Sequence, residues 1–178
     1  MRLKTVQFFM FHKQIKILMI ERKVRDFKWK LLNRCLTTEA KLKHIANSDG
    51  LCKLCGIEIE DEEHIMNCDS QGEYWNYVNT FIARINNVKL NEQLLVIGYT
   101  IPGTEGNVIN CVIEEAKWVA WKRRCTIRYE DKWINDVQMI RMFKARVKNR
   151  LELIIRSEKL SRLYDRETVL LSEILMHM

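Results

Sequence analysis

The chain has 178 residues, of which 47% are hydrophobic, with one proline and six glycines. A chain of this length can bury a substantial core as one domain or two small lobes, and the scarcity of proline and glycine favours helices. No run of about 18 apolar residues occurs, because His12, Lys13 and Lys16 interrupt the most hydrophobic stretch, so we expect neither a membrane-spanning helix nor a signal peptide.

Charge is distributed unevenly along the chain, whose formal net charge is +7. Residues 1–50 carry 12 Lys or Arg against 4 acidic residues, residues 51–120 carry 4 against 11, and residues 121–178 carry 14 against 8. Two basic segments therefore flank an acidic one. Basic segments of this kind are available for contacts with phosphates.

The first region, residues 1–49, is predicted to form basic N-terminal helices. Apolar residues recur at helical spacing up to about Arg34. Thr38 is placed to cap a second, short helix, with Leu42 and Ile45 facing inward.

The helix predicted up to Arg34 carries basic residues interleaved with Phe27 and Trp29. Such a face suits binding to nucleic-acid phosphates, and it is equally typical of a solvated helix surface, so both interpretations stay open. The candidate phosphate contacts in this region are Arg22, Lys23, Arg25, Lys28, Lys30 and Arg34.

The second region, residues 50–75, holds four residues at metal-ligand spacing, Cys-x2-Cys-x8-His-x3-Cys. A cysteine pair separated by two residues can turn both sulfurs inward, and ligands four residues apart share one face of a helix. Three thiolates and one imidazole form a closed set of the kind that structural zinc uses. A redox-active cysteine pair and a chance grouping of thiols are the alternatives. The predicted zinc ligands are Cys52, Cys55, His64 and Cys68.

The acidic run at residues 60–63 stands where a helix is predicted to begin, with Asp61 as its N-cap. We interpret this run as an acidic helix start and not as a catalytic carboxylate pair. The segment that carries the cysteine pair and the residues up to Cys68 is called the knuckle. Four apolar side chains are expected to form a wall against which it packs: Ile57, Ile59, Ile65 and Met66. The remaining cysteines, expected to be buried or free thiols, and the remaining histidines have no neighbour at ligand spacing: Cys35, Cys111, Cys125, His12, His44 and His177.

The third region, residues 76–178, is predicted to be a helical C-terminal extension. Residues 94–101 are the one strand-like run, and a loop or lobe boundary is expected near residues 102–107. Amphipathic periodicity predicts helices over residues 74–85, 109–120, 134–154 and 160–176. Further candidate phosphate contacts follow the second of these helices: Lys122, Arg123 and Arg124.

The predicted fold class is therefore mostly α, a helical domain with a Cys-Cys-His-Cys zinc knuckle inserted between helices. Free thiols beside a metal knuckle indicate a reducing compartment, the nucleus or the cytoplasm.

The knuckle and its flanks resemble the reverse transcriptase zinc-binding domain, which follows the polymerase in non-LTR, LINE-type retrotransposons. Beyond the four ligands, the resemblance includes Glu60 before the histidine, Ile65 and Met66 after it, and Trp75 seven residues past the last cysteine. It covers about residues 24–160, most strongly residues 27–75. The Trp- and Leu-rich helix upstream in that family's pattern, with its Leu-x-Thr element, is matched here by Phe27, Trp29, Leu31, Leu32, Leu36, Thr37, Thr38 and Leu42.

This resemblance implies zinc as the cofactor and RNA or DNA as the partner, held through phosphate contacts near an upstream reverse transcriptase domain. A full-length relative would be an RNA-directed DNA polymerase. This chain has neither a Tyr-x-Asp-Asp polymerase signature nor an endonuclease pattern, so we predict a non-catalytic module without a small-molecule substrate or a membrane partner. The alternative is a zinc-stabilised structural or protein-interaction domain, a retrotransposon-derived fragment that does not bind nucleic acid.

Overall fold

The computed structural model describes residues 21–45, 48–85, 88–91, 93–97, 101–161 and 176. The described part is mostly helical and contains no β-strand, only an isolated antiparallel bridge between Leu51 and Ile59. None of its helices is long and apolar enough to cross a membrane. The elements are α2 (Arg22–Leu32), α3 (Glu39–Leu42), α4 (Glu62–Asn67), the 3-10 turn η1 (Asp69–Gln71), α5 (Gly72–Ala83), the π-helical turn η2 (Gln93–Ile97), α6 (Gly103–Glu130) and α7 (Asp136–Ser161).

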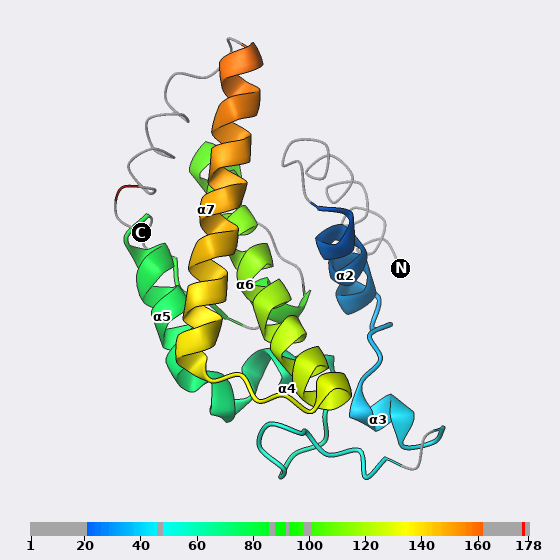
Figure 1. The fold of residues 1–178 in the computed structure, drawn as a ribbon. Helices are drawn as coiled ribbons and strands as arrows, with labels where there is room; N and C mark the ends of the chain where they lie inside the picture. The colour runs from blue at the N-terminus through cyan, green and yellow to red at the C-terminus, as the bar shows by residue number, and fades with distance from the viewer. Residues whose placement is uncertain are drawn as a thin grey trace.

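Two long helices, α6 and α7, form an antiparallel pair on which the other elements are arranged (Figure 1). α5 packs against α7, and α2 packs against α6 on the other side of the pair. α4 contacts α6, and α3 lies near the same end of that helix. The predicted metal ligands thus lie at one end of the helical scaffold, on α4 and on the segment between α3 and α4.

The core between α5 and α7 is built around an aromatic cluster. The ring of Phe143 meets those of Tyr74, Tyr77 and Phe81 edge to face, with centroids 6.2, 6.2 and 5.6 Å away. Edge-to-face pairs of this kind add about 0.5–1.5 kcal/mol each beyond the burial of their area. The apolar stripes predicted for residues 74–85 and 134–154 are confirmed as core, because their central residues are fully buried, namely Tyr74, Val78, Ile82, Phe143, Val147 and Leu151.

Asp136, the first residue of α7, joins three helices. Its Oδ1 atom lies 2.8 Å from Nη1 of Arg123 on α6, and its Oδ2 atom accepts a 2.9 Å hydrogen bond from the backbone N–H of Tyr74 near the start of α5. That N–H is one of the amides that a helix start leaves without an intrahelical partner. The Tyr74 hydroxyl then donates to the carbonyl oxygen of Ala116 on α6, at 2.9 Å.

Three predictions about local structure are wrong. The strand expected at residues 94–101 is replaced over its described first part by η2, with Leu94, Leu95 and Val96 buried. The loop or lobe boundary expected near residues 102–107 lies inside α6 from Gly103 onward. Ile45, expected to face inward, is 83% exposed. The first part of the N-terminal helix, residues 1–20, and most of the last predicted helix lie outside the described residues.

A close backbone contact at the start of α6 requires glycine at position 106. Asn110 holds the backbone of Ile101 through two hydrogen bonds, accepting from its N–H at 3.0 Å and donating to its carbonyl oxygen at 2.8 Å. The carbonyl is thereby fixed against Gly106. A Cβ atom at Gly106 would lie 2.4 Å from the carbonyl oxygen of Ile101, closer than unbonded atoms approach.

We predict that Gly106→Ala lowers the free energy of unfolding by about 1–3 kcal/mol, because the added methyl group overpacks this junction. Gly72→Ala is the matched control, since it is also helical and a Cβ there meets nothing within 4 Å. The control should be neutral or raise stability by up to about 1 kcal/mol. Urea denaturation of the two variants measures both effects, and equal stabilities would contradict the proposed clash.

Candidate metal centre

The knuckle is a tight reversal of the chain held by backbone hydrogen bonds. The N–H of Cys52 donates to the carbonyl of Glu58 at 2.8 Å, and the N–H of Glu60 donates to the carbonyl of Gly50 at 3.0 Å. The N–H of Gly56 returns to the carbonyl of Cys52 at 2.7 Å. Gly56 has a φ of +69°, a backbone conformation that residues other than glycine rarely adopt.

The second half of the site is presented by α4. Asp61 is its N-cap, as predicted, and its Oδ1 atom accepts from the backbone N–H of His64 at 2.7 Å. His64 lies on the helix, and Cys68 is its C-cap residue. Their separation by four residues therefore brings both side chains to the side that faces the cysteine pair.

The four donor atoms converge: one atom each from Cys52, Cys55, His64 and Cys68 lies within 4.8 Å of all the others. The sulfurs of Cys52 and Cys68 are 3.9 Å apart, and the sulfur of Cys55 is 3.4 Å from Nε2 of His64. Ligands of one tetrahedral metal ion lie about 3.8 Å apart for two sulfurs and about 3.6 Å apart for sulfur and nitrogen. The donor set therefore fits a single metal ion of that geometry.

Groups around the donors orient them as a metal site requires. The Nδ1 atom of His64 is 2.9 Å from Oε2 of Glu58, so a proton on Nδ1 leaves Nε2 free to bind a metal. The backbone N–H of Leu54 points to the sulfur of Cys52, at 3.4 Å. Both contacts stabilise the donor form of their ligand.

The two buried thiols are electrostatically coupled. The hydrogen-bond contact between their sulfurs, together with burial, raises the pKa of Cys52, whereas the same contact lowers the pKa of Cys68. A dication bound between the sulfurs would displace their protons, since thiol ligands bind a metal in the deprotonated form.

The apolar wall of the knuckle is smaller than predicted. Ile65 and Met66 on α4 are fully buried, which confirms half of the expected wall. Ile57 and Ile59 are 80% and 61% exposed, so their predicted packing is wrong. Both belong to the segment 56–59, all of whose residues are exposed.

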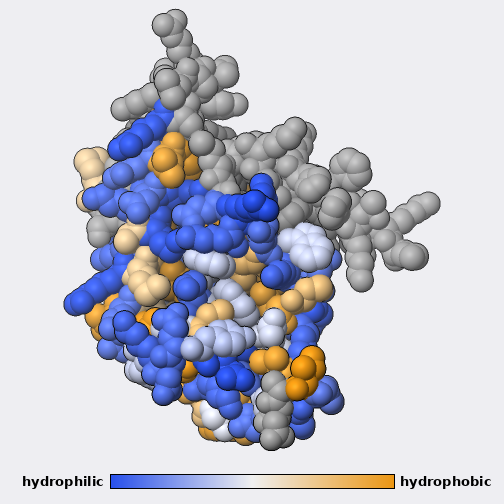
Figure 2. Space-filling view, turned by 45° about the vertical axis from the view of Figure 1, so that its right-hand side comes forward, coloured by the Kyte–Doolittle hydropathy of each residue, from blue (hydrophilic) through white to orange (hydrophobic). Residues whose placement is uncertain are grey.

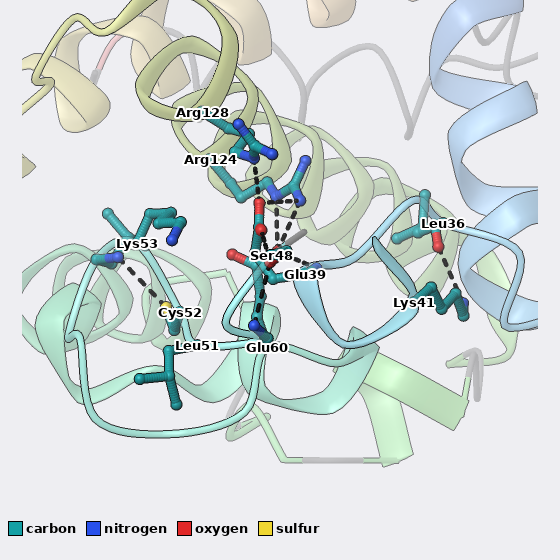
Figure 3. Close-up of polar contacts among 12 residues, drawn as sticks. Leu36, Glu39, Lys41, Ser48, Leu51, Cys52, Lys53, Glu60, Arg124 and Arg128 are labelled. Carbon is teal, nitrogen blue, oxygen red and sulfur yellow. Dashed lines mark hydrogen bonds and ion pairs between the residues drawn. The ribbon is translucent and has the colours of Figure 1, made fainter. Parts of the chain in front are cut away.

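Two acids of the run, Glu60 and Glu62, are buried, and Glu60 binds the knuckle to the scaffold. Glu60 is fully buried, and its Oε1 atom accepts from the backbone N–H of Glu39 at 3.0 Å and from Nε of Arg124 at 2.8 Å (Figure 3). The carboxylate of Glu39 is also fully buried. It accepts hydrogen bonds from the guanidinium of Arg128 and from the hydroxyl of Ser48. A chain of alternating charges therefore runs from the knuckle through α3 into α6.

Three of the predicted phosphate contacts are buried, so their expected exposure is wrong. Lys28, 5% exposed, pairs with Glu114 at 3.2 Å, because α2 packs that side chain against α6. Arg123 and Arg124, each 2% exposed, are turned toward Asp136 and Glu60.

The other predicted contacts lie at the surface. Arg22, Lys23 and Lys30 are exposed on α2, Arg25 and Lys122 are half-buried, and Arg34 is exposed and pairs with Glu63. Lys23 on α2 and Lys122 on α6 come together at a cavity of about 180 Å³, whose lining also includes Trp118, Val119, Met142 and Arg146.

Some residues of the site were not predicted from the sequence. Glu58 falls six residues before His64, and a carboxylate so near a candidate ligand was a usable signal for its partner. The pairing of Glu60 and Glu39 with Arg124 spans 64 and 85 residues, and no local pattern indicates contacts at that separation.

No family model, no curated protein and no solved structure matches this chain. The convergence of Cys52, Cys55, His64 and Cys68 therefore stands on the chain's own geometry.

We predict that Arg124→Met destabilises the fold by about 3–5 kcal/mol, because it leaves the buried carboxylate of Glu60 without its charged partner. Adding Glu60→Gln should recover part of the loss, since an uncharged amide is less costly to bury. Arg141→Met, at an exposed position of α7, is the control and should change stability by less than about 0.5 kcal/mol. Denaturant unfolding compares the four proteins, and equal stability of the Arg124 and Arg141 variants would contradict the assignment.

Proposed function

We propose that the site binds one structural zinc ion per chain. The observation that carries this proposal is the convergence of three sulfurs and one imidazole nitrogen at tetrahedral spacing. All four positions of a tetrahedral ion are then filled by protein, so the ion supplies folding free energy, on the order of 10 kcal/mol, and no open position for a substrate. Glu58 fixes the tautomer of His64, and Gly56 lets the cysteine pair reverse.

Thiol labelling with iodoacetamide tests the zinc site. In the zinc-loaded protein Cys52, Cys55 and Cys68 should be protected, and a chelator should make all three reactive. The exposed Cys35 should react in both states. Cys111 serves as the internal reference for folding, because burial raises the pKa of its thiol to about 12 and should keep it unreactive while the core is closed.

Metal analysis of Cys68→Ser completes the test, since that variant should lose zinc and the local fold together. The zinc assignment fails if the unmodified protein holds no zinc or if Cys68→Ser retains it fully.

We further propose that the chain is a non-catalytic, nucleic-acid-binding module akin to the C-terminal region of a non-LTR retrotransposon reverse transcriptase. The order of ligands and flanking hydrophobic residues supports the kinship, and the formal charge of +7 supports a polyanionic partner. Its role would be to hold RNA or DNA near an upstream polymerase domain in the nucleus or cytoplasm.

The surface that supports phosphate binding joins α2 and α6. Lys23 and Lys30 lie seven residues apart on α2, and both are exposed. Lys122 reaches the same side from α6, at the cavity it shares with Lys23. Figure 2, which is turned so that the α2 side of the molecule comes forward, shows a largely hydrophilic face. Phosphates bound there would be contacted by side chains of two helices.

The alternative, a zinc-stabilised protein-interaction domain, is supported by a different observation. Ile57 and Ile59 expose 80% and 61% of their surface on the knuckle, where a partner protein could cover them.

A salt titration of oligonucleotide binding distinguishes the two functions. We predict that Lys23→Gln, Lys30→Gln and Lys122→Gln, combined, weaken binding and reduce the slope of log affinity against log salt. The slope should fall by about 0.7 to 0.9 for each lysine that no longer neutralises a phosphate. The affinity should depend little on sequence, because phosphate contacts carry no base information.

The control is the combination Arg141→Gln, Lys148→Gln and Arg156→Gln, which removes the same charge from exposed positions of α7. Equal weakening by both combinations would show an effect of net charge alone and contradict the proposed surface. No binding even at low salt would favour the protein-interaction domain.

A further inference from the structure

Two aromatic side chains lie exposed where α6 ends and the connection to α7 begins. Tyr129 is 60% exposed and Trp133 is 56% exposed. In the part of the chain that the structure describes, Trp29 on α2 is the other large aromatic residue with comparable exposure, at 44%. The end of α6 lies beside α3 and α4, on the side of the molecule that carries the metal centre (Figure 1).

Trp133 has one arginine over its ring, and Tyr129 has two. The guanidinium of Arg123 lies 5.4 Å from the ring centroid of Trp133. The guanidinium groups of Arg124 and Arg128 lie 5.6 and 5.7 Å from that of Tyr129. A cation over an aromatic face is attracted by the ring quadrupole and restricts the ring.

The three arginines are themselves fixed by hydrogen bonds and ion pairs to other segments. Arg123 bonds Asp136 at 2.8 Å and the carbonyl of Ser70 at 3.3 Å. Arg124 bonds Glu60 through Nε at 2.8 Å, and Arg128 bonds Glu39. Rings supported in this way lose little conformational freedom when a ligand stacks on them, so they are preorganised for contact.

We propose that Tyr129 and Trp133 form a stacking platform for unpaired bases of single-stranded nucleic acid. This inference rests on the proposed nucleic-acid binding and assigns it a preferred form. Flat aromatic faces stack on any base, whereas the bases of a duplex already cover one another.

The charges around the platform favour stacking over phosphate binding. Arg123, Arg124 and Arg128 are each paired with a carboxylate, and the exposed Lys132 follows the exposed acids Glu130 and Asp131. Little uncompensated positive charge remains there. The platform therefore adds affinity that depends on bases, while the salt dependence comes from the surface between α2 and α6.

The test compares Trp133→Ala with the unmodified, zinc-loaded protein in binding a single-stranded uridine oligomer of about 12 nucleotides, a length within the range of single-strand sites. The variant should bind about 5- to 150-fold more weakly, the range typical of removing one stacked base, with an unchanged salt slope. An abasic oligomer of the same charge should bind both proteins equally. Tyr129→Ala should behave like Trp133→Ala.

Two conservative variants distinguish stacking from simple apolar contact. Trp133→Phe keeps a flat ring and should retain most of the affinity, whereas Trp133→Leu keeps apolar area and should behave like the alanine variant. A duplex of the same length should bind the unmodified protein more weakly than the single strand.

The outcomes separate this inference from the proposed function. Oligomer binding that falls with salt but is unaltered in both alanine variants overturns the platform and leaves the phosphate surface in place; the rings would then suit a protein partner. Equal losses on the abasic oligomer also overturn it. If no oligomer binds at low salt, the proposed function fails and the platform with it.

Discussion

The buried ion pair between Glu60 and Arg124 is the interaction on which the arrangement of the molecule depends. Both side chains are almost fully inaccessible to water, and removing one partner from such a pair leaves an uncompensated charge. Glu60 belongs to the knuckle and also bonds the first amide of α3, whereas Arg124 belongs to α6. This pair adds to the burial of Ile65 and Met66 and to the packing of α4 on α6, which also hold the candidate site to the scaffold. Together these contacts give the centre a fixed position relative to the longest helix.

The sequence could predict the parts of the site that depend on local spacing, but not those that depend on long-range pairs such as this one. The cluster of four candidate ligands and the Asp61 cap were predictable because local spacing determines them: two residues for the knuckle and four for a helix face. The burial of Lys28, Arg123 and Arg124 was not, because it depends on Glu114, Asp136 and Glu60, which the fold brings from other segments. A run of cations in sequence carries no information about which of them meets a distant carboxylate.

The fold shows a similar division. Stripes at helical spacing predicted the core of α5, α6 and α7, since burial of one helix face follows directly from periodicity. The apolar run beginning at Leu94 has no such period. It forms a π-helical turn that packs against neighbouring helices. The loop expected after Pro102 was wrong for a related reason. Gly106 is there because a backbone carbonyl approaches α6 closely, and the glycine does not break the helix.

Asp136 has a consequence for the order in which the chain is assembled. Its bond to Arg123 closes a loop of 13 residues, whereas its bond to Tyr74 joins residues 62 apart. Loop-closure entropy makes the second closure costlier by about 1.4 kcal/mol. The α6–α7 hairpin can therefore form from local contacts alone, and its carboxylate is then already in place to receive the start of α5. One side chain thus couples a local folding event to a distant one.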